Sequence, residues 1–266
     1  MLAGPFIANV TVLVLTYNEA PNIRRTLDAL HAFPEIVVLD SGSTDDTVAM
    51  AAQYPNVRIE RRAFDQHAAQ WNYALTQCGV ARDWILALDA DYVLTKALCD
   101  EIARLPAETP YAGYRVKFRY CSHGQRLRGA LYPPAVVLYR RASASYVQEG
   151  HTQRIVIDGR IGTLSACIDH DDRKSLSRWL ASQKKYAQLE ADHLLSKPSK
   201  QRGILDRIRL LALPAPILVF FYSLLWKRCL FDGWPGWFYV LQRTFAETLL
   251  ALEILERRLC QSMRAH

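Results

Sequence analysis

Residues 84–91 read Trp-Ile-Leu-Ala-Leu-Asp-Ala-Asp, and this stretch decides the fold. Its apolar beginning is typical of a buried β-strand, which ends at two carboxylates, Asp89 and Asp91. Alternate side chains of an extended chain point the same way, so the two carboxylates emerge on one side. Hard oxygen donors at the carboxyl end of a strand suit Mg²⁺ or Mn²⁺ carrying a diphosphate. A solvated turn after a strand is the alternative interpretation.

The chain before this stretch alternates strand-like and helix-like segments. Apolar runs predict strands at residues 10–15, 36–39 and 57–59. The segments between them predict helices at residues 22–30, 48–53 and 68–76. This alternation predicts an α/β fold with a mostly parallel sheet and helices on both faces.

Three of the predicted strands end in polar clusters, at residues 16–19, 40–46 and 89–91. In a parallel sheet these strand ends lie along one edge, where ligands bind. Together the clusters indicate a nucleotide site with a metal ion. The glycine-rich phosphate fingerprints G-x-G-x-x-G and G-x-x-x-x-G-K-[ST] do not occur, which disfavours a dehydrogenase or a P-loop ATPase.

Composition and charge limit the class of protein further. With 266 residues, of which 50% are hydrophobic and 22% charged, the chain is globular rather than disordered. Residues 171–266 hold 16 Lys and Arg against 9 Asp and Glu, so they carry the whole net charge of +7. Since the same region is the most apolar, an anionic membrane surface is favoured over nucleic acid. Six scattered cysteines and no evident signal peptide fit reduced thiols in a cytosolic setting.

The motifs Thr16-Tyr-Asn-Glu19, Asp40-Ser-Gly-Ser-Thr-Asp-Asp-Thr47 and Asp89-Ala-Asp91 resemble the family 2 glycosyltransferases, which have the GT-A fold. They stand in the order and spacing of that family and cover roughly residues 10–95. The pattern is most similar to the lipopolysaccharide-core β-1,4-glucosyltransferase-like branch.

The resemblance implies a role for each matching residue. The residues lining the nucleoside pocket would be Thr16, Tyr17 and Glu19. Asp40 would accept hydrogen bonds from the base, expected to be uracil. Asp89 would lie near the ribose and the metal, and Asp91 would coordinate the divalent ion between the phosphates. Members of this branch often carry an acid at the next position, where this chain has Tyr92.

An inverting transfer to a hydroxyl group needs a base, and a partly buried carboxylate can supply it. The resemblance implies that this base is an acid that follows the strands of the acceptor half. Glu149 is the match, with Asp169 and His151 as runners-up. A salt-bridged turn glutamate is the alternative for Glu149.

His170 resembles the third metal ligand of some GT-A enzymes, and its imidazole would favour Mn²⁺ over Mg²⁺. The competing interpretation is a helix-capping cluster, in which Asp171 and Asp172 stabilise the N-terminus of a helix that begins near residue 175.

The C-terminal third predicts membrane-associated helices. An amphipathic helix is expected over residues 175–195, and residues 210–226 then carry no charge, near the lower limit for a span. Because Pro214 and Pro216 interrupt this segment, a kinked helix lying in the membrane interface is favoured over a true span or a buried helical hairpin. An aromatic turn at residues 231–237 and a last helix at 238–259 follow.

Together these features predict a GT-A-like catalytic domain over residues 1–172, with a nucleotide-sugar half at about 1–95 and an acceptor half at about 96–172. Residues 173–266 would form a helical membrane-associated region. The expected location is the cytoplasmic face of the bacterial inner membrane, peripheral or monotopic.

The activity implied by the resemblance is inverting, metal-dependent hexosyl transfer. The donor would be a nucleotide-diphosphate sugar, with UDP and glucose expected, and the acceptor a lipid-linked saccharide such as a lipopolysaccharide core or a polyprenyl-diphosphate-linked glycan. No nucleic-acid partner is expected, and a homo-oligomer is left open. The alternatives are a polyprenyl-phosphate hexose synthase and, in another class, a non-catalytic membrane-bound scaffold.

Overall fold

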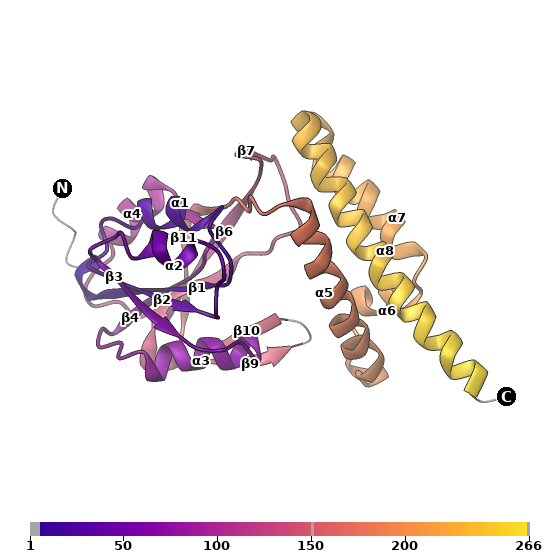
Figure 1. The fold of residues 1–266 in the computed structure, drawn as a ribbon, viewed down its shortest axis with the longest axis horizontal. Coiled ribbons are helices and arrows are strands. Elements are labelled where there is room, and N and C mark those ends of the chain that lie inside the picture. The colour runs from indigo at the N-terminus through magenta and orange to yellow at the C-terminus, as the bar shows by residue number, and fades with distance from the viewer. Residues whose placement is uncertain (1–5, 150–151, 265–266) are drawn as a thin grey trace. The chain divides into compact units, whose positions relative to one another are not determined.

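The structure, a computed structural model, describes residues 6–149 and 152–264 (Figure 1). The chain divides into two compact units. The first comprises residues 1–126, 132–148 and 152–174, and the second comprises residues 127–131, 149–151 and 175–266. Each unit has its own buried core.

The first unit is built on a nine-stranded sheet with the order β3-β2-β1-β4-β8-β6-β11-β5, in which β7 also pairs with β6. Its strands are β1 Val10–Thr16, β2 Glu35–Asp40, β3 Val57–Arg61, β4 Trp84–Asp89, β5 Tyr92–Leu94, β6 Gly113–Ser122, β7 Gln125–Arg126, β8 Ala135–Arg140 and β11 Ile161–His170. The half from β3 to β4 is parallel. Beyond β4 the sheet is mixed, since β8 is antiparallel to both of its neighbours, while β6 and β11 are parallel. A separate two-stranded sheet joins β9 Ala144–Glu149 to β10 Thr152–Ile157.

Helices cover both faces of the parallel half because its apolar side chains alternate between two cores. Val12 and Leu86 belong to the core that contains residues of α1 Ile23–Asp28, α2 Thr47–Ala51 and α4 Lys96–Ala103. Leu13 and Ile85 belong to the core under α3 His67–Gln77. Because these strands are buried on both faces, their sequences are continuous apolar runs, and these runs predicted them. The α/β fold predicted from the sequence is confirmed.

The pairing of β11 with β6 contains a bulge. Thr163 pairs with Arg115, but the next aligned pair is Cys167 with Lys117. β11 therefore has more residues than β6 between these two pairs. After the bulge the register is regular up to His170. β5 then pairs with the last residues of β11 in the antiparallel direction. Across the bulge β11 advances by four residues and β6 by two, so alternate side chains of β11 keep their faces.

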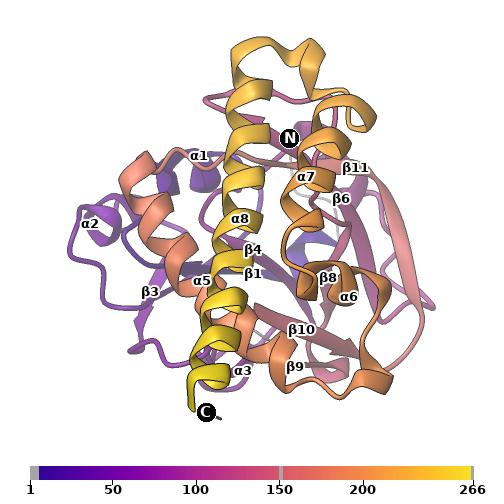
Figure 2. The ribbon, with the colours of Figure 1, turned by 90° about the vertical axis from the view of Figure 1, so that its right-hand side faces the viewer.

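The second unit is helical (Figure 2). Its helices are α5 Leu176–Ser196, α6 Ile204–Leu210, α7 Pro214–Phe221 and α8 Gly233–Arg264. Short 3₁₀ turns at Ser199–Gln201 and Cys229–Asp232 and a π-helical turn at Tyr222–Trp226 connect them. α8 packs against α5 and α7, and a small core contains residues of α5, α6 and α8, among them Ala191, Leu210 and Ile254.

Two expectations for this unit are wrong in detail. Pro214 does not break a helix but begins α7, where a proline at the first position loses no hydrogen bond. The expected turn at residues 231–237 is a turn only up to Asp232, and residues 233–237 are the start of α8. A Cβ added to Gly236 would lie 2.0 Å from the backbone oxygen of Cys229, so glycine permits this close contact. Within residues 6–149 and 152–264 no single helix is long and apolar enough to cross a membrane. Pro214–Trp226 and Cys229–Met263 reach that limit only as a pair bent by 66°.

Candidate active site

The carboxyl ends of β1, β2 and β4 meet at one edge of the sheet. In the parallel register Thr16 pairs with Asp40, and Leu15 pairs with Asp89. The side chains of Thr16 and Asp40 are in direct contact, with Thr16 Oγ1 donating to Asp40 Oδ1 at 3.2 Å. The structure thus brings together the strand ends that the sequence motifs mark.

Asp40 shapes the loop that follows it. Its carboxylate accepts from the backbone N–H groups of Gly42 and Ser43, both at 2.9 Å, and from Ser43 Oγ at 2.5 Å. With Thr16 this makes four donors on a side chain that is 1% exposed. Gly42 has a φ of +90°, which a glycine adopts at no steric cost. A carboxylate has about four acceptor positions, so a direct contact from Asp40 to a base would have to replace one of these donors.

The loop after β1 is tied to the loop after β2. Asn18 has a φ of 55°, a left-handed conformation that asparagine tolerates better than most residues. Its side-chain oxygen accepts from the backbone N–H of Thr44 at 2.7 Å and of Asp45 at 3.2 Å. Beside it, Tyr17 is 55% exposed, which leaves its ring accessible to a ligand. Its predicted place in a nucleoside pocket stays a prediction.

Glu19 is held by two polar side chains. Its carboxylate contacts Lys174 Nζ at 2.7 Å and accepts from Asn22 Nδ2 at 2.8 Å. Burial and, to a smaller extent, the charge of Asp91 outweigh the attraction of Lys174 and raise the pKa of Glu19 to about 7. The Glu19 carboxylate thus lies beside Lys174, and its predicted place in a nucleoside pocket stays a prediction.

Asp91 and His170 come together, although 79 positions separate them in the sequence. His170 is the last residue of β11, and its Nε2 lies 3.4 Å from Asp91 Oδ2. Burial favours neutral Asp91, but the charges of His170 and then Lys174 outweigh it and lower the pKa of Asp91. Burial, together with repulsion from Asp91, raises the pKa of Asp89 to about 6.

Aromatic rings surround the imidazole of His170. The rings of Tyr92, Tyr120 and Tyr132 lie edge-on to it, with centroids 5.2, 4.9 and 4.8 Å away. The hydroxyl groups of Tyr92 and Tyr132 are hydrogen-bonded to each other. Tyr92, which replaces the acid often found in the related branch, therefore packs against His170.

The donor set at Asp91 fits a divalent ion that takes most of its ligands from elsewhere. Asp91 Oδ1 and His170 Nδ1 are buried and have no hydrogen-bond partner in the described part of the chain. No group of three or more His, Cys, Asp or Glu in that part is arranged to hold a metal. Mg²⁺ commonly takes one or two carboxylates, with phosphates and water completing its shell. Asp91 and His170 fit an ion that binds together with a diphosphate.

The competing role of the 170–172 cluster as a helix cap is wrong. Ser175 caps α5, with its hydroxyl accepting from Arg178 N at 3.4 Å. Asp171 instead pairs with Arg25 at 2.5 Å, and Asp172 with Lys174 at 3.4 Å.

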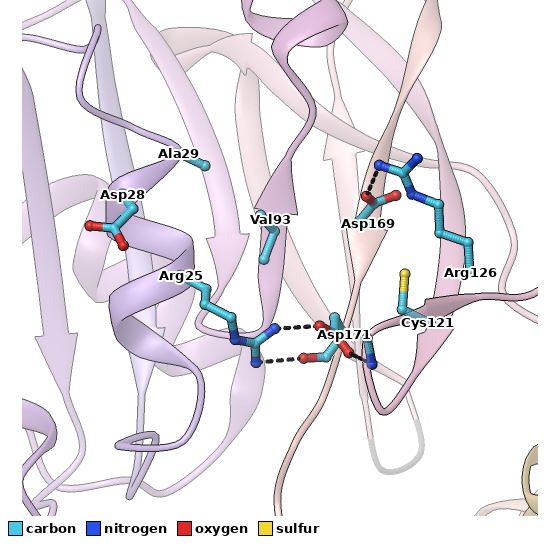
Figure 3. A pocket seen from close by; sticks show the side chains of 9 residues that line it. Arg25, Asp28, Ala29, Val93, Cys121, Arg126, Asp169 and Asp171 are labelled. Atoms are coloured by element: carbon cyan, nitrogen blue, oxygen red, sulfur yellow. Dashed lines mark hydrogen bonds and ion pairs between the residues drawn. The ribbon is translucent and has the colours of Figure 1, made fainter. Parts of the chain in front are cut away.

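On the face of β11 opposite to His170 lies an open cavity of about 720 Å³, lined by residues of α1, β5, β6 and β11 (Figure 3). Asp169 and Asp171 point into it from β11 and the residues after it, because alternate residues face opposite sides. Arg119 holds Asp169 at 2.6 Å, and Arg126 lies 3.3 Å from the same carboxylate. Asp169, a runner-up for the base, thus lies on the side of β11 opposite to His170.

Glu149 is the last residue of β9, and its side chain is exposed. It belongs to the second unit by its contacts. His151, the other runner-up, lies outside the described residues. The role of Glu149 as the base stays a prediction.

Sequence reasoning missed Lys174, Asn22 and the aromatic residues around His170. Lys174 contacts Glu19, which precedes it by 155 positions, and no short-range pattern links the two. Tyr120 could have been found only with the register of β6 against β11, and Tyr132 lies in the segment between β7 and β8.

Known proteins resemble this chain over the part that contains the three motifs. The sequence model described as "Glycosyl transferase family 2" matches residues 11–173. The lipopolysaccharide core biosynthesis glycosyltransferase LpsC of Rhizobium meliloti is 28% identical over 211 residues, covering 73% of this chain and 74% of LpsC. An uncharacterized glycosyltransferase of Rickettsia felis is 26% identical over 207 residues, 72% of each protein. The crystal structure of S. aureus TarS 1-349 in complex with UDP-GlcNAc has 17% identity and a TM-score of 0.50, covering 95% of this chain and 92% of that one. The structural similarity shows that the fold is shared, a GT-A-like one.

Proposed function

The chain belongs to glycosyl transferase family 2, and on that premise we propose that it is an inverting, metal-dependent hexosyltransferase. Its donor is a UDP-sugar, with glucose as the sugar, and its acceptor is a lipid-linked saccharide such as a lipopolysaccharide core or a polyprenyl-diphosphate-linked glycan. The observation that carries the proposal is the pair formed by Asp91, with its unpartnered buried oxygen, and His170. The name of the relative LpsC supports the acceptor class.

Each of the proposed site residues has a role in this reaction. Asp91 and His170 would hold Mg²⁺ or Mn²⁺, and the bound ion would supply Lewis-acid stabilisation of the leaving diphosphate. Asp40 fixes the loop of Gly42 and Ser43, which lies beside Thr16 at the nucleoside end. Glu149 accepts the proton of the acceptor hydroxyl while that oxygen attacks the sugar carbon opposite the diphosphate.

The donor can be identified without the acceptor, because such enzymes transfer sugar slowly to water when no acceptor is present. Purified protein with Mn²⁺ would be incubated with UDP-glucose, UDP-galactose, UDP-GlcNAc and GDP-mannose, and release of the nucleotide diphosphate measured. We expect UDP-glucose to be hydrolysed fastest. If none of the four is hydrolysed or bound, the proposed activity is wrong.

We also propose that the second unit binds the cytoplasmic face of the bacterial inner membrane, as a peripheral or monotopic protein. Large apolar side chains are exposed along α6 and α7, in the turns that flank α7 and at the start of α8. They include Ile204, Leu205, Leu213, Ile217, Phe221, Trp226, Phe231 and Trp234. Trp226 is 76% and Trp234 86% exposed. The excess positive charge of residues 171–266 complements anionic lipids, and aromatic side chains favour the headgroup level.

Flotation with lipid vesicles tests this surface. We expect the protein to float with vesicles containing phosphatidylglycerol and to remain in the soluble fraction with pure phosphatidylcholine. The double substitution Trp226→Ser/Trp234→Ser should weaken binding at least ~10-fold, because burying each large apolar side chain contributes roughly 1.5–3 kcal/mol. Ile161→Ser, at an exposed apolar residue of the first unit, is the matched control. Equal flotation of the double variant and the wild type would contradict this surface.

A further inference from the structure

Lys174 places its ammonium group among three carboxylates. Its Nζ lies 2.7 Å from Glu19 Oε1, 3.4 Å from Asp172 Oδ1 and 3.7 Å from Asp91 Oδ2. Lysine is charged at neutral pH, and here its ammonium group is within ionic contact of all three carboxylates. Lys174 is thus a counter-ion of Asp91, the residue proposed to hold the metal.

Asn22 fixes two of these carboxylates in place. Its Nδ2 donates to Glu19 at 2.8 Å and to Asp172 at 3.0 Å. Its Oδ1 accepts from Arg25 Nη2 at 2.7 Å and from the backbone N–H of Arg173 at 2.9 Å. Since Asn22 is 1% exposed, these hydrogen bonds are shielded from water. The position of the Lys174 ammonium is therefore built into the fold rather than being a chance surface contact.

We propose that Lys174 keeps a bare divalent cation out of the site and releases Asp91 only when a nucleotide diphosphate arrives. A divalent cation at Asp91 would lie beside the ammonium group, and their repulsion is strong where water is excluded. The diphosphate supplies negative charge that the ammonium can pair with, because lysine carries its charge on a flexible stem. The metal then binds with the nucleotide and not before it. The inference rests on the proposed function, since it concerns the same metal and the same diphosphate.

Calorimetric titration of the whole chain with Mn²⁺ alone tests the inference. Lys174→Met removes the charge but keeps an unbranched side chain, and we expect it to bind Mn²⁺ at least ~10-fold more tightly than the wild type. Lys174→Arg keeps the charge and should bind Mn²⁺ as weakly as the wild type. Lys96→Met is the matched control, because Lys96 is an exposed lysine that pairs with Asp100, and it should change nothing.

The wild type must first be shown to bind Mn²⁺ and UDP together. If it does, equal affinity of the wild type and Lys174→Met for Mn²⁺ alone overturns the inference. If the wild type does not bind them together, the proposed function fails instead, so the two failures are distinct. The double variant Glu19→Gln/Lys174→Met removes one charge of each sign and leaves the net charge of the cluster unchanged. This double variant replaces Lys174→Met in the titration if the single variant does not fold. It should also bind Mn²⁺ at least ~10-fold more tightly, and equal affinity would overturn the inference.

Discussion

Asp91→Asn is expected to lower sugar transfer by ~10³-fold or more and to abolish the metal-dependent binding of UDP. Asparagine keeps the shape of the side chain but removes the negative charge that faces His170 and Lys174. The ion that neutralises the leaving diphosphate would then lose its carboxylate ligand. Initial rates with the donor found in the hydrolysis panel, and calorimetry with UDP and Mn²⁺, measure the two effects.

A second aspartate separates this effect from a general loss of negative charge. Asp100 pairs with Lys96 on the surface of α4, so Asp100→Asn should keep wild-type rates. If Asp91→Asn also keeps wild-type rates, Asp91 is not part of the reaction. If the wild type itself shows no turnover and binds no UDP in the presence of Mn²⁺, the non-catalytic scaffold becomes the better interpretation.

Glu149→Gln is expected to lower transfer to a saccharide acceptor by roughly 10²–10⁴-fold, the usual contribution of a general base. A lipid phosphate acceptor is already ionised and needs no base, so a polyprenyl-phosphate hexose synthase would keep substantial turnover in this variant. The measurement compares the rates of wild type and variant with each acceptor class at saturating donor.

Binding of UDP with Mn²⁺ should be unchanged in Glu149→Gln, which distinguishes loss of the base from loss of the fold. Glu108→Gln, at another exposed glutamate, is the matched control. Unimpaired transfer to a saccharide by Glu149→Gln would exclude Glu149 as the base.

The parallel half of the sheet could be predicted because its strands are buried on both faces and end in polar motifs. The apolar run that begins at Trp84 became β4 Trp84–Asp89, and the expected helix at 68–76 became α3 His67–Gln77. β5 was missed because it has only three residues, Tyr92–Leu94. Its neighbour β11 begins with alternating exposed and buried residues, but Gly162 and Ala166 are of types that are depleted in strands, which weakens the strand signal.

The site was predicted in its motifs but not in its contacts. The resemblance implied that Asp91 and His170 hold one metal ion, and the structure places His170 Nε2 3.4 Å from Asp91 Oδ2. The contacts of Asp40 with its own loop could have been anticipated, since an aspartate two residues before a glycine commonly accepts from the backbone ahead of it. The ionic contact between Lys174 and Glu19 depends on the folded arrangement of segments far apart in the sequence.

The bulge between Thr163 and Cys167 has a consequence for how this chain can change in evolution. From Cys167 to His170 each residue has a fixed partner on β6, so inserting or deleting one residue there would exchange the two sides of the strand. Asp169 or Asp171 would then replace the imidazole beside Asp91, and two carboxylates would repel each other at the metal position. Between Thr163 and Cys167 the ladder is already interrupted, so a change in length there need not reach the site. Relatives of different length should therefore differ before Cys167, and their spacing from Cys167 to Lys174 should be constant.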